Sequence, residues 1–236
     1  MRLLLLSNST NTGQAYLEHA RPWLSGFLGD DVRRVLFIPY AGVTVSYDDY
    51  EGNVRETFTA LGYRLDSIHD TSDPVAAVHD AEVLAIGGGN TFRLLEQLAA
   101  QGLLEPIRRR VLAGMPYMGW SAGSNIAGPT ICTTNDMPIV EPPSFDALGL
   151  VPFQINPHYT DAHPPGHQGE TRADRLREFI ELNRDAVVAG MPEGTALRIE
   201  NDRAEWLGSK ALRIFRYAEE PQDLPLDADL GWLLGA

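Results

Sequence analysis

Short apolar runs that alternate with helical patterns constrain the fold of this chain more than any other feature. Runs of the length of a β-strand lie at residues 3–6, 35–38, 64–68, 83–86 and 115–118, and the third of them is the weakest. Continuous apolar runs of this length indicate strands that are buried on both faces. Between these runs, apolar residues recur at helical spacing. Strands that alternate with helices predict an α/β fold, a doubly wound and mostly parallel sheet flanked by helices.

The carboxyl ends of the strands in such a sheet are where ligands bind. The loops after residues 38, 86 and 118 are therefore expected to share one rim. Residues 126–150 are rich in proline and threonine and are expected to form loops. The carboxy-terminal apolar runs, at residues 196–199, 204–207 and 212–215, predict additional antiparallel strands that extend or flank the main sheet.

The length of 236 residues and the absence of a linker-like stretch predict a single domain over residues 1–236. The formal net charge of −13 argues against a general surface for nucleic acids or anionic membranes. Cys132 is the sole cysteine, so the chain has no internal disulfide and no cysteine-based zinc site. The amino-terminal run of leucines is too short for a signal peptide, and no stretch approaches the ~20 apolar residues of a membrane span. We therefore expect a cytoplasmic protein.

Residues 119–123 read Gly-Trp-Ser-Ala-Gly and match the pattern G-x-S-x-G. An apolar run precedes Ser121 and small residues follow it, which is the strand, turn and helix context of a nucleophile elbow. Glycines suit such an elbow because the strand and helix backbones approach closely and the serine backbone is strained. The alternative is a glycine-rich turn that carries a surface serine.

A serine nucleophile needs a base, and usually a carboxylate that orients the base. His158 follows an apolar strand candidate at residues 153–155 and is expected on the rim of Ser121 if that strand is parallel. Asp136 and Glu193 compete for the third position, and spacing does not separate them. The remaining histidines are expected to be surface or loop groups: His19, His69, His79, His163 and His167.

The glycine run 87–89 has three interpretations. It could cradle a phosphate, but it matches neither the P-loop pattern nor the dinucleotide-binding fingerprint. It could be a plain turn between a strand and a helix. It could also supply a donor to an oxyanion hole, in which case the amides of Gly88 and Ala122 would face the oxyanion.

Four segments together resemble the peptidase E family, the α-aspartyl dipeptidases, which are serine peptidases related to the cyanophycinases. The similarity runs over about residues 2 to 215, and the segments are Ala85-Ile86-Gly87-Gly88-Gly89-Asn90-Thr91-Phe92, Gly119-Trp120-Ser121-Ala122-Gly123, Asn156-Pro157-His158-Tyr159 and Gly169-Glu170-Thr171-Arg172. The resemblance implies a fold like the class I glutamine amidotransferases and hydrolysis of dipeptides with an amino-terminal aspartate. It implies Ser121 as nucleophile and His158 as base, with Asp136 or Glu193 as the third member. It also points to Asn90 and Arg172 as substrate-binding residues.

Arg172 stands out on chemical grounds as well. Residues 171–174 fit a capping box, which places Arg172 at the first helical position, where its charge opposes the helix dipole. One explanation is a solvated arginine that pairs with Glu170 or another nearby acid. The other is that Arg172 binds the side-chain carboxylate of the substrate, with help from the amides of the helix end.

The sequence thus predicts a serine exopeptidase that hydrolyses Asp-Xaa dipeptides through an acyl-enzyme, with no cofactor and no metal. The expected partner is a small peptide rather than a nucleic acid or a membrane, and a homodimer is left open. One alternative is a catalytically silent binding module on the same fold. Another is a metal-dependent hydrolase, although the spacing of its candidate ligands fits no helical ligand pair. These candidate ligands are His158, Asp161, His163 and His167.

Overall fold

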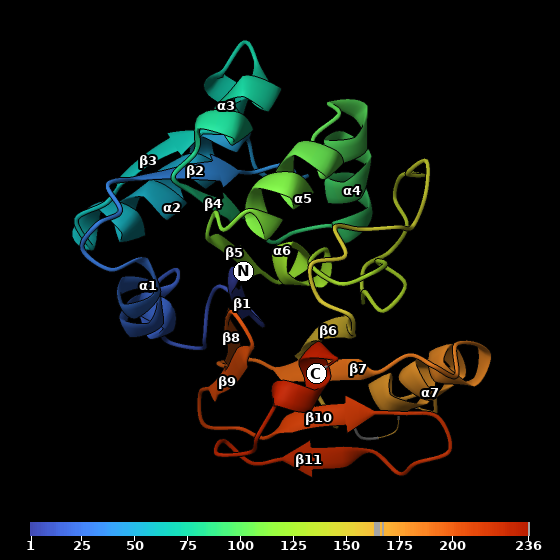
Figure 1. Ribbon diagram of the computed structural model, residues 1–236. Helices are drawn as coiled ribbons and strands as arrows, with labels where there is room; N and C mark the ends of the chain where they lie inside the picture. The colour runs from blue at the N-terminus through green and yellow to red at the C-terminus, as the bar shows by residue number, and fades with distance from the viewer. Residues whose placement is uncertain (163–165, 167, 236) are drawn as a thin grey trace.

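The computed structural model describes residues 1–162, 166 and 168–235, which form two sheets with flanking helices (Figure 1). The larger sheet has seven strands in the order β3-β2-β4-β5-β1-β8-β9. Its first five strands are parallel, whereas β8 and β9 are antiparallel to their neighbours. The predicted mostly parallel sheet and its antiparallel extension are therefore confirmed. The strands are β1 (Arg2–Leu6), β2 (Arg34–Ile38), β3 (Arg64–Ser67), β4 (Val83–Ile86), β5 (Tyr117–Trp120), β8 (Ala196–Glu200) and β9 (Arg203–Leu207).

Helices cover both faces of this sheet (Figure 1). Leu4 and Leu6 pack with α1 and α2 on one face, while Leu3 and Leu5 pack with the helices on the other. Because successive side chains of a strand point to opposite faces, burial on both faces requires consecutive apolar residues, which β1 has from Leu3 to Leu6. The helices are α1 (Arg21–Leu28), α2 (Tyr47–Ala60), α3 (Pro74–Asp80), α4 (Thr91–Ala100), α5 (Leu104–Leu112) and α6 (Ala122–Asn125), with the short 3-10 helices η1 (Glu18–Ala20), η2 (Ile68–Asp70) and η3 (Gly231–Leu234).

The second sheet has the order β11-β10-β7-β6, and α7 packs against it through Leu176 and Ile180. Only β6 and β7 are parallel to each other in this sheet. The strand candidate at residues 153–155, expected near the main rim, is the start of β6 and belongs to this second sheet. The elements are β6 (Gln154–Tyr159), α7 (Arg172–Leu182), β7 (Val188–Pro192), β10 (Leu212–Phe215) and β11 (Gln222–Leu224).

The strand predicted at residues 115–118 begins two residues later, at Tyr117. The amides of Gly114 and Met115 still bond to carbonyls of α5, so these two residues complete the end of that helix. Residues 126–153 form loops with one isolated bridge, between Thr130 and Asp146, as expected from their composition.

The loops after β2, β4 and β5 share one rim, as predicted. Ala41, Gly88 and Ser121, one from each loop, line the same cavity of about 750 Å³. The three strands are parallel neighbours in the sheet, so their carboxyl ends lie side by side. This cavity is the setting of the candidate active site.

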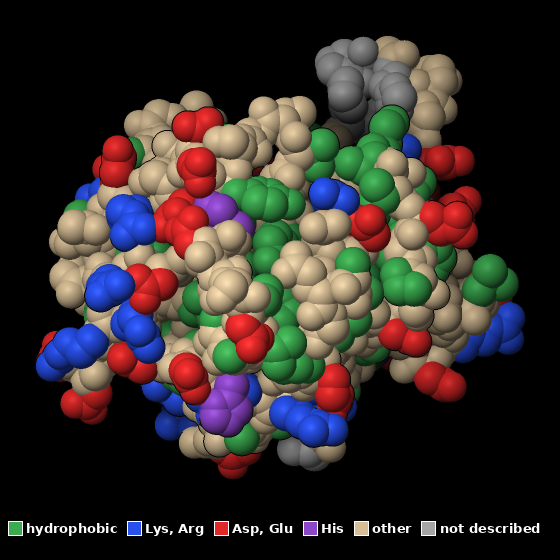
Figure 2. All heavy atoms as spheres, turned by 90° about the horizontal axis from the view of Figure 1, so that it is seen from above, with side chains coloured by type: hydrophobic (Ala, Val, Ile, Leu, Met, Phe, Trp, Pro, Cys, Tyr) green, Lys and Arg blue, Asp and Glu red, His purple; other side chains and the backbone are tan. Residues whose placement is uncertain are grey.

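Acidic and basic side chains are intermixed on the face of the molecule shown in Figure 2, and no continuous basic patch covers it. None of the helices in the described part of the chain has the length and apolar character needed to cross a membrane.

Candidate active site

Ser121 lies in a sharp turn between β5 and α6, with φ 53° and ψ −114°. The two glycines of the motif are required by close backbone contacts. A Cβ atom on Gly119 would lie 2.2 Å from the Gly123 carbonyl oxygen, and one on Gly123 would lie 2.1 Å from the Ile86 carbonyl oxygen. Positive φ is unfavourable for a residue with a side chain, so the packing of β5 against α6 holds Ser121 in a strained conformation.

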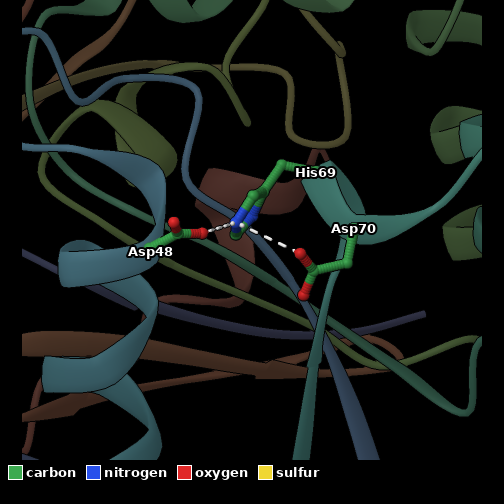
Figure 3. Close-up of side chains that lie close together, drawn as sticks. All are labelled: Asp48, His69 and Asp70. Carbon is green, nitrogen blue, oxygen red and sulfur yellow. Dashed lines mark hydrogen bonds and ion pairs between the residues drawn. The ribbon is translucent and has the colours of Figure 1, made fainter.

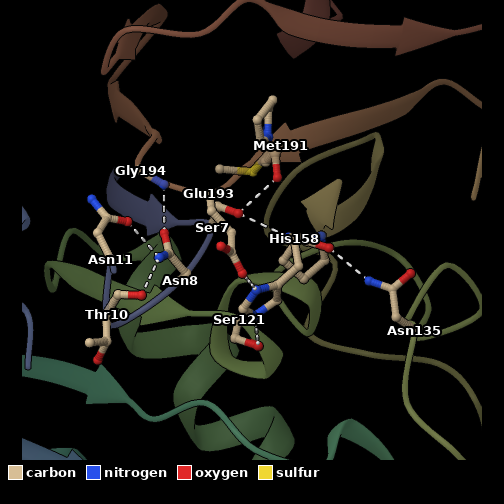
Figure 4. A network of polar contacts seen from close by, with 12 residues as sticks. Ser7, Asn8, Thr10, Asn11, Ser121, Asn135, His158, Met191, Glu193 and Gly194 are labelled. Atoms are coloured by element: carbon tan, nitrogen blue, oxygen red, sulfur yellow. Dashed lines mark hydrogen bonds and ion pairs between the residues drawn. The ribbon is translucent and has the colours of Figure 1, made fainter. Parts of the chain in front are cut away.

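Three side chains form a hydrogen-bonded chain at this turn (Figure 4). Ser121 Oγ lies 2.8 Å from His158 Nε2, and His158 Nδ1 lies 2.7 Å from Glu193 Oε1. Ser121 comes from the main sheet, whereas His158 lies in β6 and Glu193 directly follows β7 in the second sheet. Hydroxyl, imidazole and carboxylate in this order are the groups that remove a proton from a serine hydroxyl.

The backbone of His158 is strained as well, with φ 54°. Its amide donates to Ser7 Oγ at 2.9 Å, and its carbonyl oxygen accepts from Arg172 Nη1 at 2.9 Å. Ser7 is fully buried and donates its own hydroxyl proton to the Met191 carbonyl oxygen at 2.7 Å. Ser7, which directly follows β1, and Arg172, on α7, therefore hold the backbone of the candidate base at its N–H and at its C=O.

The turn that carries Glu193 is attached to the loop after β1 (Figure 4). The Gly194 amide donates to Asn8 Oδ1 at 2.7 Å, and Lys210 Nζ donates to the Glu193 carbonyl oxygen at 2.9 Å. Sequence reasoning did not identify Ser7 or Asn8 as supporting residues. Their place, directly after a buried parallel strand, was the signal that could have found them.

Asp136, the other carboxylate considered for the third position, bonds to the start of α4 and not to His158. Its Oδ2 atom accepts hydrogen bonds from the Thr91 amide at 2.7 Å and the Thr91 hydroxyl at 2.6 Å, which caps the start of α4. Asn90 is the N-cap of the same helix, where its side chain accepts from the Arg93 amide, and it also lines the cavity that contains Ser121. Of the two competing carboxylates, Glu193 is the one within hydrogen-bond reach of His158.

Two backbone amides near Ser121 are candidates to receive an oxyanion. Ala122 is the first residue of α6, so its N–H group has no acceptor within the helix. Gly88 is pressed against the nucleophile, since a Cβ atom on it would lie 2.9 Å from Ser121 Cβ. Its amide has no hydrogen-bond acceptor within the part of the chain that the structure describes. Both N–H groups are therefore free to donate a hydrogen bond to a substrate oxygen.

Arg172 is the first residue of α7, and the expected capping box between Thr171 and Asp174 is formed. Arg172 does not pair with Glu170, whose carboxylate lies 3.9 Å from Arg175. It instead donates to the backbone of His158, and burial is the main cause that lowers its pKa. A guanidinium group thus lies next to the candidate base.

The alternative metal group of His158, Asp161, His163 and His167 is only partly visible, because His163 and His167 lie outside the described residues. Asp161 accepts a hydrogen bond from the Tyr159 hydroxyl at 2.6 Å. Among the described residues, three potential metal ligands lie close together, on Asp48, His69 and Asp70. The carboxylates of Asp48 and Asp70 both pair with His69 Nε2 (Figure 3). None of these three residues lines the cavity beside Ser121.

Comparison with known proteins agrees with the resemblance seen in the sequence. A model of peptidase family S51 matches residues 3–207. Proteins named peptidase E are 50% identical in Nostoc sp. (99% of this chain, 96% of the relative) and 50% identical in Streptomyces coelicolor (99% and 95%). The crystal structure of a peptidase from an acI-B1 Actinobacterium has the same fold, with a TM-score of 0.72 at 18% identity (97% and 96% covered). The chain therefore belongs to peptidase family S51.

Proposed function

We propose that this peptidase is a serine dipeptidase that hydrolyses dipeptides with an amino-terminal aspartate through an acyl-enzyme on Ser121. The observation that carries the proposal is the chain of hydrogen bonds from Ser121 through His158 to Glu193. In this proposal the hydroxyl of Ser121 is the nucleophile, the imidazole of His158 is the base and the carboxylate of Glu193 orients the base.

In the first half of the reaction, Ser121 Oγ attacks the carbonyl carbon of the peptide bond while its proton moves to His158 Nε2. The carbonyl oxygen becomes an oxyanion, which the amides of Gly88 and Ala122 stabilise. Glu193 accepts a hydrogen bond from His158 Nδ1, so it selects the tautomer whose Nε2 can take the proton and stabilises the imidazolium that forms.

In the second half, the C–N bond breaks and His158 donates the proton to the leaving amine. The aspartyl group remains esterified to Ser121. A water molecule then attacks this ester while His158 takes its proton. As the ester bond breaks, His158 returns this proton to Ser121 Oγ and aspartate is released. Nucleophile, base and oxyanion donors are all groups of the chain.

The preference for aspartate rests on Arg172. A guanidinium group can bind a carboxylate through two parallel hydrogen bonds, and Arg172 lies beside the base, where the acyl part of the substrate has to lie. Apolar side chains, those of Val43, Val45 and Ile139, border the cavity that contains Ser121. A cavity of this size suits a small ligand such as a dipeptide.

The direct test is Ser121→Ala, assayed with Asp-Leu. Loss of the nucleophile is expected to lower kcat about 1,000-fold or more, because only binding and oxyanion stabilisation remain. The thermal unfolding midpoint, measured in parallel, should stay near that of the wild type. Turnover by the variant within tenfold of the wild type would remove Ser121 from its proposed role.

Two controls separate the alternatives. A sulfonyl fluoride should label the wild type at Ser121, as read by peptide mass spectrometry, and the absence of labelling together with absent turnover would favour a silent binding module. A chelator should leave turnover unchanged. If removal of a bound metal abolished turnover, the metal-dependent hydrolase would be the better description.

A further inference from the structure

A buried tyrosine hydroxyl lies directly beneath the glycine turn 87–89. Tyr50, on α2, donates its hydroxyl proton to the Gly88 carbonyl oxygen at 2.9 Å. The Tyr50 hydroxyl oxygen itself accepts from Trp120 Nε1 at 3.1 Å and from the Tyr16 hydroxyl at 3.2 Å. A phenol has one donor and two acceptor positions, so every position of this hydroxyl is used. Its orientation is therefore fixed.

The bond to Gly88 helps to orient the peptide unit between Gly88 and Gly89, which also packs against Ala41, since a Cβ atom on Gly89 would lie 2.2 Å from the Ala41 carbonyl oxygen. The C=O of Gly88 and the N–H of Gly89 belong to one planar trans peptide, so they point in opposite directions. Glycine restricts its backbone less than any other residue, and three glycines in a row need an external restraint. Tyr50 also contacts Gly87, where a Cβ atom would lie 2.5 Å from the phenol oxygen. One side chain thus restrains two consecutive residues of the turn.

This restraint acts through a carbonyl and leaves the amide protons unused. Neither the Gly88 amide nor the Gly89 amide has an acceptor among the described residues. Burial raises the pKa of Tyr50, so the phenol stays protonated and continues to donate. The turn is held in place, yet its donors remain available to a ligand.

The same hydroxyl connects the turn to the nucleophile. Trp120, whose indole donates to Tyr50, is fully buried and directly precedes Ser121. Gly88 in turn packs against the Ser121 side chain. Tyr50 is therefore bonded both to the segment that carries the nucleophile and to the turn that carries a proposed oxyanion donor.

We propose that Tyr50 is a positioning residue that orients the glycine turn 87–89, so that its amide protons face the oxyanion. The inference rests on the proposed serine mechanism and adds to it a residue outside the triad. Donors that are fixed before the reaction stabilise developing charge without a cost of reorganisation. Tyr50 borders the cavity that contains Ser121, but its hydroxyl bonds to Gly88, Trp120 and Tyr16, so its proposed effect on the oxyanion acts through the glycine turn.

The test compares Tyr50→Phe with Tyr63→Phe, a matched control. The Tyr63 hydroxyl also donates to a glycine carbonyl, that of Gly29 at 3.0 Å, and the two tyrosines are similarly buried (7% and 8% exposed). Misplaced donors are expected to lower kcat for Asp-Leu about 10- to 100-fold in Tyr50→Phe, with KM nearly unchanged. Tyr63→Phe should retain the wild-type kcat.

A second measurement, the inhibition constant of a compound that mimics the oxyanion, tests the oxyanion donors separately from the rest of the site. The aldehyde analogue of aspartate would form a hemiacetal with Ser121 whose oxygen occupies the oxyanion position. The control is 3-aminopropanoate, which keeps the amine and the side-chain carboxylate of aspartate but has no carbonyl or carboxyl group to place an oxygen there. In Tyr50→Phe, the inhibition constant of the aldehyde should rise by the same factor by which kcat falls. The inhibition constant of 3-aminopropanoate should not change. A merely structural role would change both constants together or neither.

The outcomes separate this inference from the function on which it rests. A wild type without Ser121-dependent turnover overturns both. An active wild type with unchanged kcat and unchanged aldehyde binding in Tyr50→Phe overturns only the role of Tyr50. If Tyr50→Phe does not fold, a crystal structure of the wild-type enzyme with the aldehyde bound to Ser121 tests whether Tyr50 still bonds to Gly88. A Gly88 carbonyl that still accepts from Tyr50 supports the role, and a flipped peptide overturns it.

Discussion

Glu193 and Asp136 are both acidic residues in loops near the active site, yet they contact different parts of the molecule. Glu193 reaches the imidazole of His158 although its own side chain is about half exposed (54%). Asp136 instead accepts from Thr91 and Thr134 at the start of α4. The chain order of Ser121, Asp136 and His158 suits a triad, but Glu193 is the carboxylate within hydrogen-bond reach of His158, and we therefore propose it as the third member.

Glu193→Gln and Asp136→Asn are therefore expected to have unequal effects. Loss of the carboxylate that orients the base can lower kcat by about four orders of magnitude at a buried site, and the exposure of Glu193 should bring this nearer to 100-fold. Asp136→Asn should lower kcat less than about tenfold, because a neutral amide can still accept the hydrogen bonds at the helix start.

The measurement is kcat for Asp-Leu, with thermal unfolding of both variants as the control. A larger loss of turnover in Asp136→Asn would reassign the orienting carboxylate. Equal and small losses would indicate that Ser121 and His158 act as a dyad.

Among the elements, those defined by local sequence were predicted well. The elbow depends on Gly119 and Gly123, which lie within two residues of Ser121, and so the pattern in the sequence contains its steric requirement. The sheet to which β6 belongs is harder to predict. Its apolar residues predict a strand, but nothing in a short run says which sheet it joins, and residues 153–155 were expected near the main rim. The prediction that His158 meets Ser121 thus agrees with the geometry, although the base approaches from the second sheet.

The start of α7 carries a prediction about specificity. Arg172→Ala is expected to lower kcat/KM for Asp-Leu about 100-fold or more, because the substrate carboxylate would be left without its partner. Arg172 also bonds to the His158 backbone, so its loss can disturb the base directly. Ala-Leu, which has no side-chain carboxylate, is the internal control.

The ratio of the two kcat/KM values separates these effects. If Arg172 binds the carboxylate, the ratio of Asp-Leu to Ala-Leu should fall strongly in the variant. If hydrolysis of both dipeptides declines by the same factor, Arg172 acts through His158, and another group recognises aspartate.

At the scale of the whole molecule, the candidate active site is divided between two sheets. Ser121 and the glycine turn belong to the seven-stranded sheet, while His158 and Glu193 belong to the four-stranded sheet. A donor–acceptor distance of 2.8 Å between Ser121 and His158 therefore depends on how the two sheets are placed relative to each other. Ser7 bridges them, since it directly follows β1 and bonds to β6 and β7.

The place of Ser7 directly after a buried strand indicates a position on the rim, but its bond to the second sheet could not be predicted from the sequence. Ser7 and His158 are 151 residues apart, and their contact arises only after both sheets have formed. A buried serine after a strand has many uses, and no local pattern distinguishes a bond to a neighbouring loop from one to a second sheet. The same reason explains why Asn8, which supports the turn of Glu193, was missed.

Ser7→Ala is expected to reduce both stability and turnover. It leaves the His158 amide and the Met191 carbonyl without their buried partner, which should lower the free energy of unfolding by about 1–3 kcal/mol. The base would also lose a restraint on its strained backbone, so kcat for Asp-Leu should fall about tenfold. Ser67→Ala is the control, because Ser67, in the edge strand β3, is also buried but bonds to His69 Nδ1, away from the cavity that contains Ser121. Urea unfolding should show a loss of stability in both variants, whereas only Ser7→Ala should lose turnover. If Ser67→Ala lost as much turnover as Ser7→Ala, general destabilisation would explain both, and the bridge between the sheets would have no specific role in holding the base.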